Sequence, residues 1–246
     1  MSPRTPLLRP DRYFDERGVS IARGLAVLAL VTTAMTAGVY GLGWVLTERI
    51  DGTVTVDNPE RPPDAVCDSA AASPETASDF GGGMESRCDE PKEVERDIDE
   101  LLWRAVSDAA GQVMLGFPLL WLFIGLLLHA GSWLAGGDGS AANSWAVAAW
   151  GLAPGVAGLA AGLLVLSLTV EPTTVSAATE PTALRRHVVD SLGALEAVGT
   201  VTGVVTTLWG AVVWRFGLQE GRGVHGTAAS AVAGGAALFL LLFGAV

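Results

Sequence analysis

The chain has 246 residues, half of them apolar, and a mean hydropathy of +0.43. Its formal net charge of −11 does not suggest nucleic-acid binding, which requires a basic face. The apolar residues form blocks of about 20, the length of a membrane-spanning helix, and charges collect between the blocks. In a helix the backbone N–H and C=O groups are hydrogen-bonded to one another, so a helix can cross the bilayer without unsatisfied polar groups. The pattern therefore predicts an all-α polytopic membrane protein: a bundle of five transmembrane helices with one long external loop.

Nearly all of the positive charge is arginine, and Lys92 is the only lysine. An acidic, lysine-poor composition is typical of proteins from cells that contain molar salt. A high-GC genome also favours arginine over lysine. We expect a halophilic source, with the genomic explanation as the alternative.

Residues 1–20 predict a cytoplasmic lead-in, which is too charged for the apolar part of a signal peptide. Two interpretations of its apolar side chains remain open. They either rest on the membrane surface beside the arginines of the segment, or belong to a frayed end without a role. The apolar side chains are Leu7, Leu8, Tyr13 and Phe14.

The first predicted span covers 21–46, with Tyr40 and Trp44 near its far end, where interfacial aromatic residues lie. An acidic external loop follows at 47–108. Towards its end, apolar residues recur at three- and four-residue spacing, which predicts an amphipathic helix with Pro91 near its start. We expect this helix to lie along the surface or to run directly into the second span.

The remaining apolar blocks predict four further spans, with a polar external loop at 170–194 between the third and the fourth. The predicted spans cover 110–135, 144–169, 195–216 and 224–246.

Five spans place the two termini on opposite sides of the membrane. Positive charge near span ends favours the cytoplasm, and long loops cross the membrane regardless of charge. The turns at 136–143 and 217–223 are therefore predicted to be cytoplasmic, together with the N-terminus. The loop at 47–108 and the C-terminus are then external, in a multi-pass protein of the cell membrane. Arg185 and Arg186 oppose this orientation.

Cys67 and Cys88 are the only cysteines, and both lie in the predicted external loop. A disulfide persists outside the cell, and closing a loop of about 22 residues contributes roughly 3 kcal/mol. Two free thiols are the alternative. A metal site is poorly supported, because this loop has no C-x-x-C pair and no histidine.

The polar cluster Gly136-Gly137-Asp138-Gly139-Ser140 interrupts two apolar runs. It does not match a phosphate-binding loop, because it has no lysine and follows an apolar helix rather than a strand. A tight reversal between two antiparallel helices explains it, since glycine adopts the left-handed conformation without strain. Asn143 or Ser144 is expected to cap the returning helix.

His129 lies inside the second predicted span, where an ionisable residue is by default a functional-site hypothesis. The alternative is a neutral imidazole bonded to a carbonyl or to a facing Ser or Thr. A metal site or proton relay would lack partners, because the other His, Asp and Glu residues of the predicted spans, Glu196 and His225, lie at span ends. No catalytic set emerges from the sequence, so we expect a non-enzyme without metal or cofactor.

Small residues recur in the spans at the spacing that lets membrane helices approach closely. We expect them to pack the bundle itself, with contacts to other membrane proteins or to a second copy as the alternative. The pairs are Gly151-x-x-x-Gly155, Gly158-x-x-x-Gly162 and Gly199-x-x-x-Gly203.

Three stretches resemble the Yip family, named for interaction with Ypt/Rab GTPases, and in particular its prokaryotic, haloarchaeal-like branch. They are "RPDRYFDERG" (9–18), "WRFGLQEGRGVHGTAASAVAGGAAL" (214–238) and "LLLHAGSWLAGGDGSAANSWAVAAWGLAP" (126–154). The last combines a histidine, a GG-x-G-S turn and a span reaching Pro154. The long acidic loop departs from the family pattern. The long N-terminal region where eukaryotic members contact GTPases is missing.

The resemblance implies a cytoplasmic N-terminus, five spans and a membrane-organising or trafficking-like scaffold that acts through protein or lipid contacts. The alternative is a small transporter or channel subunit with its site near the helix breaks at Pro118 and Pro154. The absence of an internal repeat and of intramembrane carboxylates argues against transport.

Overall fold

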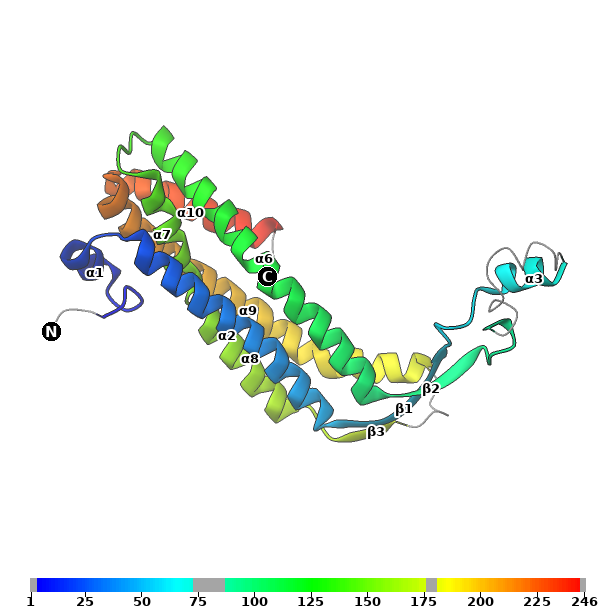
Figure 1. Cartoon of the computed structure of the whole chain (residues 1–246). Coiled ribbons are helices and arrows are strands. Elements are labelled where there is room, and N and C mark those ends of the chain that lie inside the picture. The colour runs from blue at the N-terminus through cyan, green and yellow to red at the C-terminus, as the bar shows by residue number, and fades with distance from the viewer. Residues whose placement is uncertain (1–3, 73–86, 176–180, 244–246) are drawn as a thin grey trace.

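The structure is a computed structural model that describes residues 4–72, 87–175 and 181–243, and it is mostly helical. Long helices run side by side, and a thin extension of strands projects from one end of the bundle and carries a short helix at its tip (Figure 1). In chain order the elements are α1 (Pro10–Arg17), α2 (Ile21–Thr47), β1 (Ile50–Asp57), α3 (Asp64–Ala72), β2 (Glu93–Asp97), α6 (Ile98–Leu134), α7 (Ala141–Leu152), α8 (Gly155–Thr169), β3 (Thr173–Val175), α9 (Pro181–Arg222) and α10 (Gly226–Phe243).

Among the residues that the structure describes, four helical segments are long and apolar enough to cross a membrane, and α10 is a shorter apolar helix. The four are α2, α6, α7 with α8, and the part of α9 from Ala197 to Arg222. Large apolar side chains face outward from them, among them Leu30 on α2 and Leu115 and Leu119 on α6, each more than 60% exposed. Such surfaces are tolerated where lipid rather than water covers them.

The core of the bundle lies where α6, α7, α9 and α10 meet, around Leu128, Val147, Trp214 and Ala233. Small residues bring α7 and α9 into backbone contact, since a Cβ on Gly210 would overlap the carbonyl oxygen of a glycine on α7. The indole Nε1 of Trp214 donates to the carbonyl of α7 residue Ala148 at 3.4 Å.

The two predicted external loops contain strands that the all-α prediction misses, β1 and β2 in 47–108 and β3 in 170–194. They form a three-stranded sheet in the order β2-β1-β3, with β1 antiparallel to β2 and parallel to β3. The amphipathic helix predicted near Pro91 begins only at Ile98, because residues 93–97 alternate in exposure as a strand does. The alternative that this helix runs directly into the second span is confirmed, since α6 is one helix from Ile98 to Leu134.

Arg49, which follows α2, links the end of that helix to the end of α8 through hydrogen bonds. Its guanidinium donates to the carbonyls of Ser167 (2.9 Å) and Val170 (2.7 Å) at the end of α8. Its own carbonyl accepts from the backbone N–H of Thr173 (2.8 Å). Cations are favourable at a helix C-terminus, where carbonyls lack intrahelical partners.

Several predicted span boundaries differ from the helices. The third span begins at Ala141 rather than 144 and is divided at Pro154, which is the N-cap of α8. The fourth span is part of a longer helix, because α9 begins at Pro181, inside the predicted loop at 170–194.

The N-terminal lead-in is folded against the bundle, so both interpretations of Tyr13 and Phe14 are wrong. These side chains are 2% and 1% exposed and pack against Val213, Trp150 and their neighbours. The helix α1 ends where Arg23 of α2 donates to the carbonyls of residues 17 and 18.

Candidate functional site at the glycine turn

The glycine cluster forms the turn between α6 and α7. After α6 ends at Leu134, Gly136 adopts φ +81°, a left-handed conformation that favours glycine. The N–H of Gly137 then donates to the carbonyl of Ser132 at 2.8 Å, which satisfies one of the free carbonyls at the helix end. The geometry is that of a helix reversal.

The glycine turn lies directly on the turn that joins α9 to α10. The backbone N–H groups of Asp138 and Gly139 both donate to the carbonyl of Arg222, at 3.2 and 3.5 Å. A Cβ on Gly139 would overlap the carbonyl oxygen of Gly221. Glycine is therefore required at 139 because the two backbones touch.

Arg222 is buried at this junction and donates hydrogen bonds to the segments that meet there. Its side chain is buried, and the residue is only 3% exposed. Nε donates to Ser132 Oγ at 3.0 Å, and a terminal nitrogen donates to the carbonyl of Gly137 at 3.2 Å. Ser132 Oγ in turn donates to the carbonyl of His129 at 2.9 Å. One arginine thus joins the end of α6, the glycine turn and the end of α9. We call this set the arginine clasp.

The arginine clasp contains no carboxylate partner for Arg222 in the part of the chain that the structure describes. Its acceptors are a hydroxyl and a backbone carbonyl at the C-terminal end of α6, where the helix dipole favours a cation. Burial of a charge without an ionic partner is costly, and we expect the clasp to specify how the two turns are arranged.

The predicted caps of the returning helix are wrong. Ser140 is the N-cap of α7, and no side-chain hydrogen bond within the described part of the chain caps this helix. The side chain of Asn143 instead donates to the carbonyl of Gly221 at 2.7 Å and so adds a further link between the two turns. Ser144 Oγ is buried and has no hydrogen-bond partner among the described residues.

His129 packs beside the arginine clasp through its ring. The imidazole stacks on the indole of Trp145 from α7, with ring centroids 5.9 Å apart and planes inclined by 29°. Its Nδ1 is buried and has no hydrogen-bond partner within the described ranges. The expected bond to a carbonyl or to a Ser or Thr is therefore not made by this nitrogen.

The predicted packing glycines separate into two groups. Gly151 on α7 is in tight contact, since a Cβ there would overlap the indole of Trp214. By contrast, a Cβ on Gly155, Gly162 or Gly199 would meet no atom of the described residues within 4 Å. These three residues face open space rather than a neighbouring helix.

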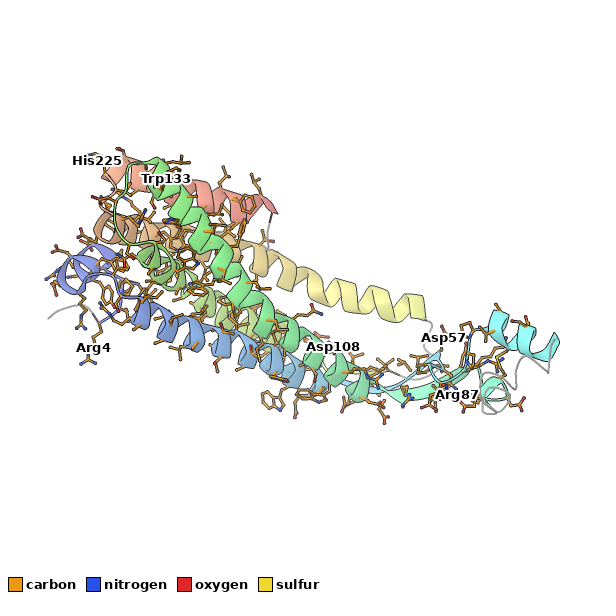
Figure 2. All side chains as sticks on the ribbon, turned by 45° about the horizontal axis from the view of Figure 1, so that its top comes forward. Arg4, Asp57, Arg87, Asp108, Trp133 and His225 are labelled. Carbon is orange, nitrogen blue, oxygen red and sulfur yellow. A yellow bond between two sulfur atoms is a disulfide. The ribbon has the colours of Figure 1, made fainter. Side chains whose placement is uncertain are left out.

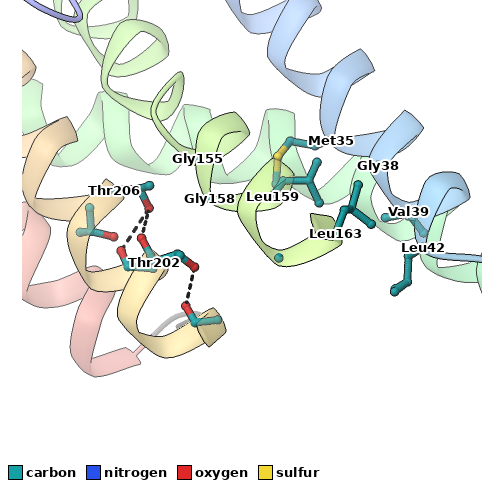
Figure 3. Close-up of a pocket in the computed structure, with 14 residues that line it drawn as sticks. Met35, Gly38, Val39, Leu42, Gly155, Gly158, Leu159, Leu163, Thr202 and Thr206 are labelled. Carbon is teal, nitrogen blue, oxygen red and sulfur yellow. Dashed lines mark hydrogen bonds between the residues drawn. The ribbon is translucent and has the colours of Figure 1, made fainter. Parts of the chain in front are cut away.

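The open space is a groove of about 430 Å³ between α2, α8 and α9 (Figure 3). The hydroxyls of Thr202 and Thr206 in its wall donate to carbonyls of their own helix, each at 2.8 Å. Apart from these hydroxyls, most of the lining is apolar. Five of the predicted packing residues line it: Gly155, Gly158, Gly162, Gly199 and Gly203.

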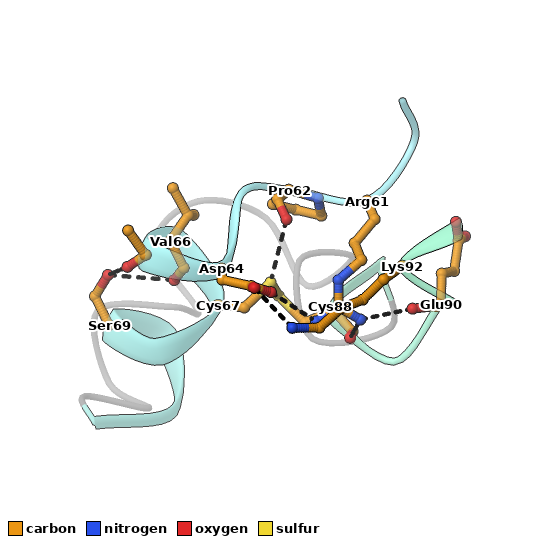
Figure 4. Close-up of a disulfide and its surroundings, with 10 residues drawn as sticks. Arg61, Pro62, Asp64, Val66, Cys67, Ser69, Cys88, Glu90 and Lys92 are labelled. Atoms are coloured by element: carbon orange, nitrogen blue, oxygen red, sulfur yellow. Dashed lines mark hydrogen bonds and ion pairs between the residues drawn. A yellow bond between two sulfur atoms is a disulfide. The ribbon is translucent and has the colours of Figure 1, made fainter. Parts of the chain in front are cut away.

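At the opposite end of the molecule, Cys67 and Cys88 form the predicted disulfide, with their Cα atoms 5.6 Å apart (Figure 4). Arg61 donates to the carbonyl of Cys88 and also pairs with Asp64. Lys92 Nζ lies 2.6 Å from Asp64. This hydrogen bond from Lys92 is the largest cause that lowers the pKa of the Asp64 carboxyl below its ordinary value of 3.8, and Arg61 adds to the shift.

Charge is segregated between the two ends. The segment 47–108 contains 17 acidic and six basic residues, a net charge of −11 that equals the charge of the whole chain. Figure 2 shows Asp57 and Arg87 on the projecting extension, far from Trp133 and His225 at the other end of the bundle. Among the described residues, no group of three His, Cys, Asp or Glu side chains is placed to hold a metal ion.

Sequence reasoning missed Arg222 as the central residue of the junction. The predicted turn at 217–223 includes it, but an arginine at the end of an apolar span is usually a surface anchor. The only signal is that both turns are rich in glycine, which indicates close approach of backbone. The structure places Pro154 at the α7–α8 break, outside the clasp.

Comparison with protein families and with known proteins gives one result. A family model described as Yip1 domain matches residues 6–246 and so covers both turns, the arginine clasp and all the apolar helices. The comparisons with curated proteins and with solved structures gave no match. The chain therefore belongs to the Yip1 family of membrane proteins.

Proposed function

We propose that this protein is a non-enzymatic scaffold that organises the membrane through contacts with proteins or lipids. Its membership of the Yip1 family supports a membrane role. The proposal includes no cofactor, and it includes other membrane proteins or a second copy of the chain as partners.

The groove between α2, α8 and α9 carries the proposal. A transport site would be expected around His129 and the helix breaks, but His129 is stacked on Trp145 at the end of the bundle, and it does not line the groove. The groove is instead lined by glycines that expose backbone. Exposed small residues let a helix from another molecule approach closely. The transporter alternative receives no support from this arrangement.

Affinity purification of the intact protein in mild detergent, followed by mass spectrometry, tests the proposal. Gly162→Leu would fill the groove, since the added side chain would meet open space. Gly116→Leu is the matched control, because Gly116 lies on α6, and its Cβ position is equally open. We expect partners that co-purify with the natural protein and with Gly116→Leu, but not with Gly162→Leu.

Two outcomes would overturn this proposal. An equal set of partners with Gly162→Leu would exclude the groove as the contact surface. Solute flux in reconstituted vesicles that is lost on His129→Ala would replace the scaffold with a transporter.

We also propose the orientation that the charges favour, in the cell membrane, with the N-terminus cytoplasmic, α10 as the fifth span and the C-terminus external. The disulfide supports an external position for the acidic segment, because disulfides persist in oxidising surroundings. After reduction of intact cells, Cys67 and Cys88 should react with a membrane-impermeant maleimide. Labelling only from the cytoplasmic side would reverse the orientation.

We retain the proposal of a halophilic source. Growth of the source cell at molar salt would support it.

A further inference from the structure

The first described residues of the chain are fixed to the side of α9 rather than beyond its end. The indole Nε1 of Trp209 donates to the carbonyl of Leu7 at 2.7 Å. Trp209 precedes Arg222, the last residue of α9, by 13 positions, which is about 20 Å of helix. Residues 4–10, which we call the N-terminal strap, therefore lie beside the apolar part of a membrane span.

The N-terminal strap exposes an apolar side chain although the segment is firmly packed. Pro6 is fully buried, whereas Leu8 is 84% exposed. On α9 the same stretch exposes Leu208 (53%) and Val212 (47%), which face lipid in a membrane-spanning helix. We expect the Leu8 side chain to lie in the same apolar layer.

Two arginines flank this leucine. Arg4 and Arg9 are both exposed, and the N-terminal strap contains no acidic residue. The acids of α1 begin at Asp11, and Arg12 of α1 already pairs with Glu16 at 3.5 Å. Arg4 and Arg9 make no ion pair with any described residue. Their guanidinium groups are free to meet an anion at the level where the apolar layer ends.

We propose that the N-terminal strap binds anionic phospholipid, with Leu8 among the acyl chains and Arg4 and Arg9 at the headgroup phosphates. One guanidinium group can donate two parallel hydrogen bonds to the oxygens of a phosphate. Arginines near the end of a span extend along apolar surface to reach the interface. Tyr13 and Phe14 anchor α1 to the bundle, so the strap presents these three side chains in a fixed position. The inference names one lipid contact of the proposed scaffold.

The full chain in nanodiscs of phosphatidylcholine with a minor fraction of phosphatidylglycerol tests the proposal, with bound lipid counted by native mass spectrometry. Arg4→Gln combined with Arg9→Gln should reduce bound phosphatidylglycerol by about fivefold per arginine, from about 1 kcal/mol per basic residue near an anionic surface. Arg104→Gln is the control, because Arg104 is an exposed arginine at the start of α6. Equal loss in the control, or no loss in the double variant, would overturn the proposal.

A second measurement locates Leu8 directly. Because the natural cysteines are bonded to each other, Leu8→Cys would provide a single free thiol for a nitroxide label. We expect this label to collide with oxygen more than with a polar nickel complex, and a label at Asp15→Cys to show the reverse. Exposure of position 8 to the nickel complex would place the strap in water and refute the contact. No partner protein is present in either experiment, so failure here leaves the purification test of the scaffold unaffected.

Discussion

Replacing Arg222 with alanine removes the side chain that joins three segments of the bundle. The variant loses two hydrogen bonds from a charged donor, one to Ser132 Oγ and one to the carbonyl of Gly137. Ser132 keeps its own bond to the carbonyl of His129, but Gly137 is buried, and its carbonyl loses this bond. The two turns would then be held by backbone contacts and by Asn143 alone.

The magnitude follows from these contacts. A hydrogen bond involving a charged group contributes about 1.5–3 kcal/mol, and Arg222 donates two. The deletion also removes the cost of burying an unpaired guanidinium, which offsets part of the loss. We expect the free energy of unfolding to fall by about 2–3 kcal/mol, in the range of a lost buried hydrogen-bond network.

Titration with SDS in mixed micelles, followed by tryptophan fluorescence, measures this change. Arg215→Ala is the matched control on the same helix, because Arg215 is exposed and its guanidinium lies over the ring of Phe216, 5.0 Å from the ring centroid. It should cost no more than about 1 kcal/mol. If Arg222→Ala unfolds at the same SDS fraction as Arg215→Ala, the clasp does not stabilise the bundle, and the reasoning fails.

Three further outcomes are expected. Gly139→Ala should lower the free energy of unfolding by about 1–3 kcal/mol, because its Cβ would overlap the Gly221 carbonyl, whereas Gly155→Ala, which meets open space, should not lower it in the same SDS titration. Reduction of Cys67–Cys88 should raise hydrogen exchange in residues 61–69 and 87–92. The bond closes a loop with a sequence separation of 21 and contributes about 3 kcal/mol. Unchanged exchange would show that the remaining contacts hold this segment together without the disulfide. The Asp64–Lys92 contact should persist above the ordinary pKa of 3.8 and be lost as the pH falls through the lowered pKa of the folded protein; exchange near residue 64 should follow this, and Asp64→Asn should abolish the dependence.

The apolar helices and the disulfide could be predicted from the sequence because each depends on a local or unique signal. An apolar run of membrane length has few alternatives to a helix. Cys67 and Cys88 had only each other as partners in the loop. The helix ends were less predictable: α9 continues beyond its apolar block at both ends, and nothing in a hydropathy pattern marks where a helix stops in water.

The sheet and the arginine clasp depend on residues far apart in the chain. Strand β3 has only three residues, too few for a periodic pattern, and it pairs with β1 from far along the chain, with Ile50 opposite Thr173. Arg222 meets Ser132 across 90 positions. Burial of Tyr13 and Phe14 likewise depends on the packing of α9 against α1. The composition of α1 alone gives no information about this packing.

The segregation of charge affects how copies of the protein would share a membrane. Outside the segment 47–108 the nine acidic and nine basic residues cancel, while the segment carries the whole net charge of −11. Neighbouring molecules would therefore repel each other mainly through these segments. At physiological ionic strength this repulsion extends over about 8 Å, and at 1 M salt it shortens to about 3 Å. Lateral crowding of the protein is then governed by the salt outside the bilayer, independently of how well the helices fit together within it.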